Sequence, residues 1–449
     1  MSSTKRTVSN FFDKEYLEYA KYVVENRAIP SCIDGLKPTQ RKVVYIANKI
    51  WKTGNEKPMK LFQLAGRVAA EAFYHHGNTS LESSMVGMAQ KFKNSLPLLE
   101  GIGQFGSLRS PSAGAPRYIS AKLHPNFRLL YQDFELLDNK IEEGEKIEPE
   151  HFLPIVPTVI LNGTSGIAVG FATNILNRNP KDVVDACIAE VNGKRIKTLT
   201  PWVEEFKGTF TRDLENPKTW KISGSYQVIN TNTVKITAIP PNYTYERYEE
   251  ILNLLQEKGI ITSYDDNSSE TIEYVLKFRR STLKDLISKD RLERALRLNT
   301  QETENLTTID ENGELKIFNK AEEIVKHFVS VRLGWYQTRK DYLINKTEKQ
   351  LALVTNKARF IKDIINSKLK INNVPKDKII AYLKTNDYDT VHGSYDYLLS
   401  MAIHSLTKER YEKLLQEKEG CIIALKTLKA TDPKEMYLTD LKKLKAAIK

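Results

Sequence analysis

The sequence predicts a multidomain α+β protein built from three successive parts. Residues 1–145 show helical periodicity between loops rich in Gly, Pro and Ser, residues 146–318 change to short alternating runs typical of strands, and residues 319–449 have a helical pattern almost to the end. A chain of 449 residues is long enough for about three domains. An apolar fraction of 41% is sufficient for several cores.

The first part contains two adjacent amphipathic segments. LFQLAGRVAAEAF, residues 61–73, gathers its apolar residues on one helical face, and after a break at YHHGN, residues 74–78, the stretch 79–92 does the same. Thr79 and Glu82 have the spacing of a capping box that would start the second helix. Two helices across a short turn form a helix-turn-helix candidate, whose second helix enters the major groove of DNA. The same pattern also fits an ordinary pair of packed helices.

The middle part alternates between strands and helices. TVKITAI, residues 233–239, and TIEYVLKF, residues 271–278, have the period-2 alternation of half-buried strands. Between them, residues 245–259 form an amphipathic helical pattern that ends at Gly259. These patterns predict an α/β region.

The last part predicts a long arm. Residues 321–369 contain no proline, and forty-odd helical residues within them would extend roughly 60–70 Å. Such a helix needs a partner, and residues 405–430 are long enough to run back along it, with residues 395–403 capping the far end. We therefore expect an antiparallel coiled-coil arm.

The amino-acid composition limits the classes of partner and the cellular compartment that we expect. Lys and Arg outnumber Asp and Glu by 68 to 56, for a net charge of +12, which favours nucleic acid first and an anionic membrane second, although it also serves plain solubility. The three cysteines lie far apart and favour reduced thiols in the cytosol or nucleus. The sequence shows no apolar signal segment and no run approaching the roughly 18 apolar residues of a membrane span.

The first cluster suited to chemistry is basic. Arg27, Lys37, Arg41 and Lys42 surround a loop broken by prolines and a glycine within residues 25–50. Helix propensity does not require so many cations there, whereas contact with phosphate does. A solvated basic surface is the alternative.

The second cluster is the YHHGN stretch. His75 and His76 are adjacent, so their side chains point to different sides of most backbones, and a shared metal ion is not expected. A histidine next to a helix N-terminus can hold an anion, although a lone histidine is more often structural.

The third cluster, residues 98–120, combines a glycine-rich loop with the pair Arg117 and Tyr118. Backbone N–H groups of such a loop can approach phosphate. A tyrosine has a pKa near 10, so as a nucleophile it needs a neighbouring cation or base. Arg117 stays protonated and cannot act as the base, but it can stabilise charge on a phosphate under attack. Pro116 fixes its own φ and disfavours a helical turn just before the pair.

The fourth cluster is glycine-bounded. Gly163, Gly166 and Gly170 permit tight turns within residues 153–175, with Ile167 between them. An exposed apolar wedge on such a loop can insert between DNA base steps and kink the duplex. A buried core segment is the alternative.

Together and in this order, the four clusters resemble the DNA breakage-reunion part of the type IIA DNA topoisomerases. The matching stretches are RAIPSCIDGLKPTQRKVVY, YHHGN, GQFGS, APRYI and ILNGTSGIAVGFATNI, and LLSMAIHSLTKERYEKLLQEKE is similar to the segment at the dimer-closing gate of these enzymes. YHHG and SLTKERYEKL are closer to the eukaryotic and T-even phage branch than to gyrase. The chain most resembles the medium, DNA-cleaving subunits of the T-even phage enzymes, and next the A subunits of bacterial gyrase and topoisomerase IV.

The resemblance assigns a fold and a role to each part. It implies a winged-helix (helix-turn-helix) DNA-cleavage domain in residues 1–145, an α/β tower domain in 146–318, and a coiled-coil arm with a helical C-gate in 319–449. By the same match Tyr118 would form a transient 5′-phosphotyrosyl bond in each strand, so that a second duplex can pass. The implied catalytic residues are Tyr118, Arg117, His76 and Arg27, and the implied DNA-binding residues are Lys37, Arg41, Lys42, His75, Gln104 and Ile167.

The resemblance also implies partners and cofactors. Mg²⁺ is expected with acidic ligands supplied mainly by a partner subunit, so no metal ligand is expected in this chain, and ATP would be used by the partner. Neither an ATP-binding signature nor a Glu-Gly-Asp…Asp-x-Asp pattern is found in the sequence. The other expected partners are double-stranded DNA and a second copy of the chain, held through the C-gate, in the cytoplasm of a cell or phage host and away from membranes. The sequence lacks a C-terminal pinwheel pattern, which favours relaxation and decatenation.

Two alternatives remain. An architectural DNA-bending protein would use the basic residues and Ile167, but would have no use for Arg117 and Tyr118. A coiled-coil scaffold with a basic head would account for the arm and leave the first 175 or so residues unexplained.

Overall fold

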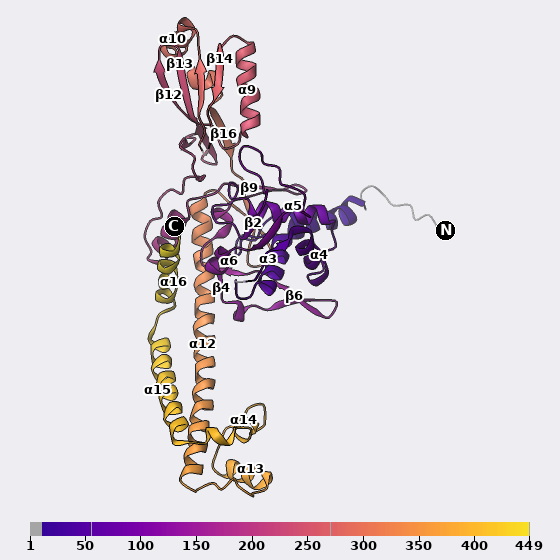
Figure 1. The fold of residues 1–449 in the computed structure, drawn as a ribbon, viewed down its shortest axis with the longest axis vertical. Helices are drawn as coiled ribbons and strands as arrows, with labels where there is room; N and C mark the ends of the chain where they lie inside the picture. Colours follow the sequence, from indigo (N-terminus) through magenta and orange to yellow (C-terminus); the bar gives the residue numbers. More distant parts are fainter. Residues whose placement is uncertain (1–10, 55, 270, 449) are drawn as a thin grey trace, which may run out of the picture. The chain divides into compact units, whose positions relative to one another are not determined.

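A computed structural model describes residues 11–54, 56–269 and 271–448 of the chain (Figure 1). The chain divides into two compact units, one of Met1–Arg332 with Leu438–Lys449 and one of Leu333–Tyr437. Each unit is described below by itself.

The N-terminal part of the first unit packs helices against a small antiparallel sheet. Strand β3 (Ser120–Leu123) lies between β1 (Met59–Lys60) and β2 (Leu99–Ile102). The helices are η1 (Phe11–Tyr16), α2 (Leu17–Val23), η2 (Val24–Ala28), α3 (Pro38–Ile50), α4 (Leu61–Glu71) and α5 (Asn78–Ala89). The helix over residues 61–73 is confirmed, because α4 buries Leu61, Leu64, Ala65 and Val68 on one face.

The start of α5 differs from the prediction. The N-cap is Gly77, and no side-chain capping bond is present. Thr79 lies inside the first turn, so its hydroxyl is not in the N-cap position and the predicted capping box is wrong. The helix ends at Ala89, which leaves Phe92 beyond it.

Short elements lead from this part to the middle of the chain. They are α6 (Pro125–Leu130), β4 (Tyr131–Gln132), η3 (Phe134–Leu136), β5 (Asn139–Glu142), β6 (Glu145–Pro149), β7 (Leu153–Pro154), α7 (Thr158–Leu161), β8 (Thr164–Ile167), β9 (Ala172–Ile175) and α8 (Pro180–Val191). Strand β4 pairs with β7, so hydrogen bonding crosses the predicted boundary at residue 145. The boundaries at residues 145 and 318 stay predictions.

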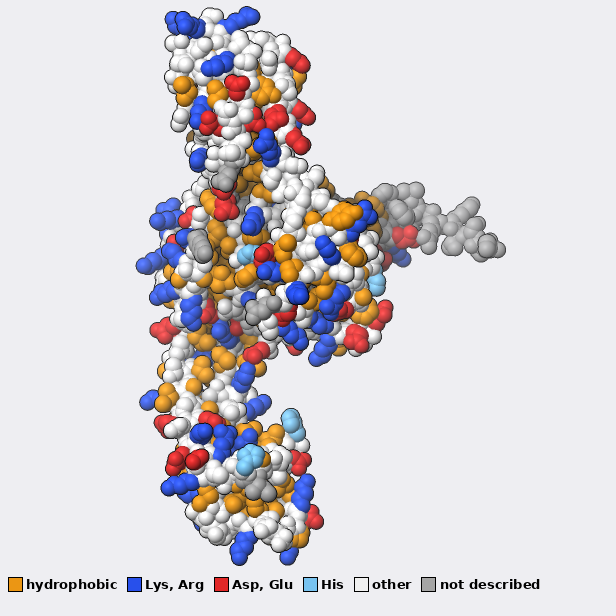
Figure 2. Space-filling view, viewed as in Figure 1, with side chains coloured by type: hydrophobic (Ala, Val, Ile, Leu, Met, Phe, Trp, Pro, Cys, Tyr) orange, Lys and Arg blue, Asp and Glu red, His pale blue; other side chains and the backbone are white. Residues whose placement is uncertain are grey.

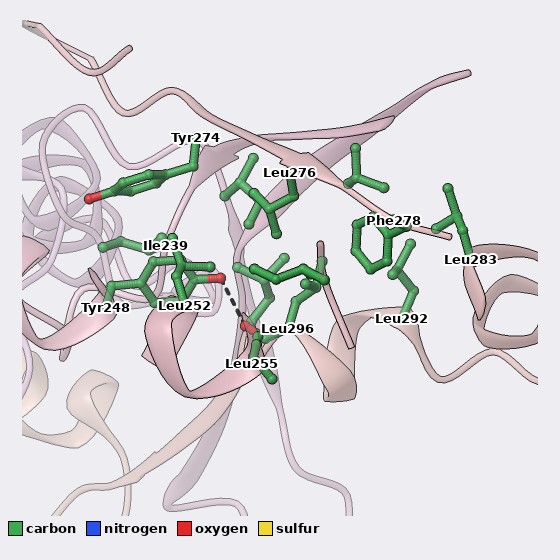
Figure 3. Close-up of a cluster of buried hydrophobic side chains, with 14 of the residues drawn as sticks. Ile239, Tyr248, Leu252, Leu255, Tyr274, Leu276, Phe278, Leu283, Leu292 and Leu296 are labelled. Carbon is green, nitrogen blue, oxygen red and sulfur yellow. Dashed lines mark hydrogen bonds between the residues drawn. The ribbon is translucent and has the colours of Figure 1, made fainter. Parts of the chain in front are cut away.

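A four-stranded antiparallel sheet in the order β12-β13-β15-β14 has a core of its own. The predicted strands are confirmed as β13 (Thr233–Ala238) and β15 (Tyr274–Lys277), flanked by β12 (Ser225–Asn230) and β14 (Ser263–Asp266). Helix α9 (Tyr245–Glu257) covers the sheet, as predicted, and Gly259 follows it with φ +68°. Figure 3 shows the buried side chains, among which the Tyr248 hydroxyl donates to the Leu296 carbonyl at 2.8 Å.

The remaining elements of the first unit complete two further sheets. Strand β11 (Thr219–Ser223) lies between β10 (Thr209–Arg212) and β16 (Asn299–Thr303), and β17 (Leu306–Ile309) pairs with β18 (Leu315–Phe318). Two helices, α10 (Arg280–Ser288) and α11 (Leu292–Ala295), precede β16.

The second unit is helical. It contains most of α12 (Ala321–Ile365), then α13 (Lys376–Thr385), α14 (Asp396–Leu399), η4 (Ile403–Ser405), α15 (Lys408–Ala430) and the start of α16 (Pro433–Ala447). The predicted antiparallel return is present, because Leu414 at the start of α15 packs on Val354 and Ile361, while Lys429 at its end lies 2.8 Å from Glu348. Within the described ranges, no helix is both long and apolar enough to cross a membrane.

Candidate active site

The Arg117–Tyr118 pair lies in a tight turn. The Tyr118 N–H donates to the Ala115 carbonyl at 2.9 Å, which makes Ala115–Tyr118 a β-turn with Pro116 at its second position. Arg117 has no positive φ, which excludes a type II turn and is compatible with type I. Proline is favoured at this position because its fixed φ suits the turn. Pro116 therefore shapes the turn that presents the tyrosine.

Helix α4 and strand β1 hold this turn in place. The N–H groups of Leu61 and Phe62 donate to the carbonyls of Ile119 and Pro116 at 3.1 and 3.4 Å. The Lys60 ammonium donates to the Tyr118 carbonyl at 2.8 Å. Sequence reasoning missed Lys60, because it lies far from Tyr118 along the chain and β1 has only two residues.

The phenol of Tyr118 is accessible from solvent. The residue is 70% exposed, whereas the neighbouring Ile119 is buried and anchors the strand behind it. The Arg117 guanidinium carbon lies 5.1 Å from the centroid of the Tyr118 ring. A permanent cation therefore lies over the ring of an accessible tyrosine.

The glycine-rich loop before the turn is closed by contacts between residues 105–106 and Pro111. A Cβ on Gly106, which has φ +86°, would lie 2.4 Å from the Pro111 carbonyl oxygen. The buried Gln90 amide donates to the carbonyls of Phe105 and Pro111 at 2.8 and 3.2 Å. Gln104 is exposed at this loop, and its carbonyl accepts from Gly114 at 2.8 Å. The loop thus keeps the Gln104 side chain at the surface.

The two histidines have different neighbours. His76 Nε2 lies 2.9 Å from the Tyr22 hydroxyl, and its ring meets that of Tyr74 edge-on. His75 Nε2 lies 3.2 Å from Glu142 Oε1. The two histidine rings thus contact different groups.

Arg41 is a correction to the predicted DNA contacts. Its side chain is buried, and Nε and Nη2 donate to the two carboxylate oxygens of Asp34 at 2.7 and 3.0 Å. Burial works to lower the pKa of Arg41, but the charge of Asp34 and its hydrogen bonds raise it. A guanidinium occupied in this way holds the loop together and does not face a DNA phosphate.

Lys42 is the second correction. Its side chain is only 14% exposed, and its ammonium lies 3.1 Å from Glu148 and also donates to the Ala72 carbonyl. These contacts join helix α3 to its neighbours. The buried carboxylate of Glu148 offsets the charge of Lys42, which therefore attracts a DNA phosphate only weakly.

Lys37 and Arg27 meet the glycine-bounded hairpin. Lys37 Nζ donates to the Ser165 carbonyl at 2.6 Å, and burial lowers the pKa of Lys37. A Cβ on Gly166 would lie 2.2 Å from the carbonyl oxygen of Ala28, the residue after the exposed Arg27. The close approach therefore brings three predicted residues, Arg27, Lys37 and Ile167, into one neighbourhood.

Ile167 is the exposed residue of this hairpin. It ends β8, pairs with Ala172 of β9, and is 87% exposed. The prediction of an exposed apolar side chain is confirmed for Ile167, whereas the alternative of a core segment holds for residues 153–161, whose large apolar side chains are buried. The Ile167 side chain is therefore accessible from solvent.

Metal-type donors occur away from the turn. Among the described residues, one group of three such donors lies within mutual reach: Cys32, Glu311 and His327. His327 Nε2 is 2.7 Å from Glu311, while Lys316 lies 3.1 Å from Nδ1, so the histidine is already bonded on both sides. A sulfur, nitrogen and oxygen set beside a lysine does not fit Mg²⁺, which prefers six oxygen ligands.

Basic side chains are distributed broadly. Figure 2 shows Lys and Arg spread over the visible face and interspersed with acidic and apolar residues. The net charge of +12 is thus not gathered in one patch on that face.

Comparison with known proteins places these features in a family. Residues 27–445 match the family that comprises the A subunits of DNA gyrase and topoisomerase IV. The chain is 34% identical over 450 residues to the DNA topoisomerase medium subunit of Enterobacteria phage T4, covering 99% of this chain and all of the phage protein.

Longer relatives and a solved structure are also similar. The mitochondrial DNA topoisomerase 2 of Dictyostelium discoideum is 34% identical over 98% of this chain, which spans about a third (35%) of that relative's length. The crystal structure of the Plasmodium falciparum topoisomerase II DNA-binding, cleavage and re-ligation domain matches with a TM-score of 0.86 and 33% identity, over 98% of this chain and 64% of that one. The chain therefore belongs to the family of the DNA gyrase and topoisomerase IV A subunits.

Proposed function

We propose that this chain cleaves and rejoins duplex DNA within an ATP-dependent type IIA topoisomerase, as its cleavage subunit. The observation that carries the proposal is the exposed Tyr118 beside Arg117, on a turn that α4 holds from behind. A nucleophile needs access and charge stabilisation, and this turn supplies both.

The proposed chemistry is a reversible transesterification. The Tyr118 oxygen attacks a DNA phosphorus and loses its proton, the bond from phosphorus to the 3′ oxygen breaks, and that oxygen takes up a proton. The products are a 5′-phosphotyrosyl ester and a free 3′-hydroxyl. Arg117 stabilises the charge on the phosphate during attack. Because an ester replaces an ester, rejoining is the same step in reverse and needs no ATP.

His76 and Arg27 complete the proposed catalytic set. His76 is held by the Tyr22 hydroxyl at 2.9 Å and assists near the scissile phosphate. Arg27, Lys37, His75 and Gln104 contact the DNA, whereas Arg41 and Lys42 act by supporting the fold.

In this proposal each part of the fold has its own role. We assign α3, α4, α5 and the β1-β3-β2 sheet to a winged-helix cleavage domain, and residues 146–318 to a tower domain. Helices α12 and α15 form the coiled-coil arm, and the α13–α14 region forms a C-gate through which two copies dimerise. Two tyrosines are needed to cut both strands, which favours a two-fold symmetric dimer.

In this proposal a partner chain supplies the metal ligands and hydrolyses ATP. Mg²⁺ is bound mainly by acidic ligands of that partner, since the one donor group found among the described residues does not fit the ion. The partner also hydrolyses ATP to drive passage of the second duplex. The proposed place of action is the cytoplasm, where DNA is the substrate.

The proposed role of Ile167 can be tested by measuring DNA bending. Ile167→Ala should reduce DNA bending and lower cleavage about tenfold, because the wedge that opens a base step is removed. Bending is measured by fluorescence transfer between dyes at the ends of a short duplex. Ile141→Ala is the matched control, since Ile141 is another exposed isoleucine, at 71%. An unchanged bend in Ile167→Ala would show that the wedge role is wrong.

The topology of the product tests the function as a whole. The chain is combined with the subunits that carry the ATPase and metal-binding modules, Mg²⁺, ATP and one purified DNA topoisomer. Passing a duplex through a double-strand break changes the linking number by two, so the product ladder should advance in steps of two. Steps of one would contradict the proposal, and bending without any change of linking number would favour the architectural alternative.

A further inference from the structure

We propose that Lys60 is a second phosphate-binding cation of the active site and contacts a phosphate of the cleaved strand beside Tyr118. The inference rests on the proposed function and adds a residue that neither the motifs nor the family match single out. Its basis is the position, the exposure and the unpaired charge of this lysine.

Lys60 lies at the junction of two elements that meet the turn. It ends β1, is the N-cap residue of α4, and pairs with Ser120 in the register of β1 with β3. Its ammonium donates to the Tyr118 carbonyl at 2.8 Å. Lys60 and Arg117 therefore both lie against Tyr118, Lys60 through the main chain and Arg117 over the ring.

The charge of Lys60 is not neutralised. Over the described part of the chain, no carboxylate lies within ion-pair distance of Lys60 or Arg117, whereas Lys122 on neighbouring β3 is paired with Glu100 at 3.1 Å. An ammonium has three donors, and the Tyr118 carbonyl uses one of them. Lys60 is also exposed, so its other two donors remain available to an anion.

An anion would stabilise the two unpaired cations, Lys60 and Arg117, beside Tyr118. Without a counter-charge the two cations repel each other. The N-terminal end of α4, which begins at Leu61, adds a further positive potential. A DNA phosphate next to Tyr118 relieves this repulsion and accepts from Lys60 in a charge-assisted hydrogen bond. Lys60 then joins the phosphate to the carbonyl of the nucleophile's own residue and fixes their relative position.

The test combines a protein variant with a neutral phosphate. Lys60→Met keeps the aliphatic stem and removes the charge, and should lower the rate of covalent cleavage by the holoenzyme about 10- to 100-fold. Lys57→Met is the matched control, because Lys57 is an exposed lysine three positions earlier, whose main-chain carbonyl accepts from the Trp51 indole N–H. The same rates are then measured on DNA with a methylphosphonate at the scissile phosphate and, in separate duplexes, at each neighbouring one.

The effects of Lys60→Met and of the methylphosphonate on the cleavage rate should be non-additive at one phosphate position. If Lys60 binds a given phosphate, neutralising that phosphate slows the wild type but has little further effect in Lys60→Met. Effects that multiply at every position would overturn the inference and leave Lys60 as a tether of the turn only. A Lys60→Met variant as active as Lys57→Met would also overturn it. Absence of covalent cleavage in the wild-type holoenzyme would instead count against the proposed function.

Discussion

Tyr118→Phe should abolish covalent cleavage of DNA while leaving folding and DNA binding intact. The substitution removes only the attacking oxygen, and the turn is held by main-chain bonds from Tyr118 to Ala115 and from Leu61 to Ile119. The aromatic ring remains for Arg117 to cover. No other group in the turn can replace a phenolic nucleophile, so trapped complexes should fall below detection.

The measurement uses the holoenzyme with supercoiled DNA and Mg²⁺, denatured rapidly with detergent. Linear DNA with protein on its ends is counted for the wild type, for Tyr118→Phe and for Tyr19→Phe, an exposed tyrosine outside the turn. Only Tyr118→Phe should lose the product. Cleavage at the wild-type level in that variant would refute the assignment of the nucleophile.

The largest effect on stability is expected for Asp34→Ala. Asp34 is fully buried, and its carboxylate accepts from Arg41 twice and from the N–H groups of Leu36 and Phe152. Removing it leaves a buried guanidinium without its carboxylate partner, which costs about 3–5 kcal/mol of the free energy of unfolding. Urea unfolding monitored by tryptophan fluorescence measures the change, since Trp51 is buried at the end of α3.

A surface ion pair provides the control for this prediction. Asp285 lies 2.7 Å from Lys289, and both side chains are about half exposed at 56% and 52%. Asp285→Ala should change the free energy of unfolding by less than about 1 kcal/mol. Equal losses for the two variants would mean that the Asp34–Arg41 pair is not the anchor of the loop.

Much of the architecture was predictable because it depends on local periodicity. Helix α4, strands β13 and β15, helix α9 and the long helix α12 each bury one face, and a buried face repeats along the sequence. The start of α5 was not predictable in the same way, because Thr79 and Glu82 have the spacing of a capping box but the N-cap is Gly77, two residues before Thr79.

The roles of the basic residues depend on contacts that are distant along the chain. Arg27, Lys37, Arg41 and Lys42 have the same chemistry in the sequence, and only folding shows that Asp34 and Glu148 neutralise two of them. Asp34 lies seven residues before Arg41, and this nearby acid is the sequence signal for the first of these pairs.

Two features of the turn itself needed the structure. Pro116 disfavours a helical turn, and the structure resolves this by placing it at the second position of a β-turn. Lys60 reaches Tyr118 only because the two-residue strand β1 pairs with β3, and no sequence pattern marks so short a strand.

Identification of the residue that carries the DNA is the most direct test of this account. Covalent complexes of the wild-type holoenzyme are digested with nuclease and protease, and the modified peptide is sequenced by mass spectrometry. We expect a nucleotide joined through its 5′ phosphate to the oxygen of Tyr118. A nucleotide on any other residue, or a link through a 3′ phosphate, would contradict it.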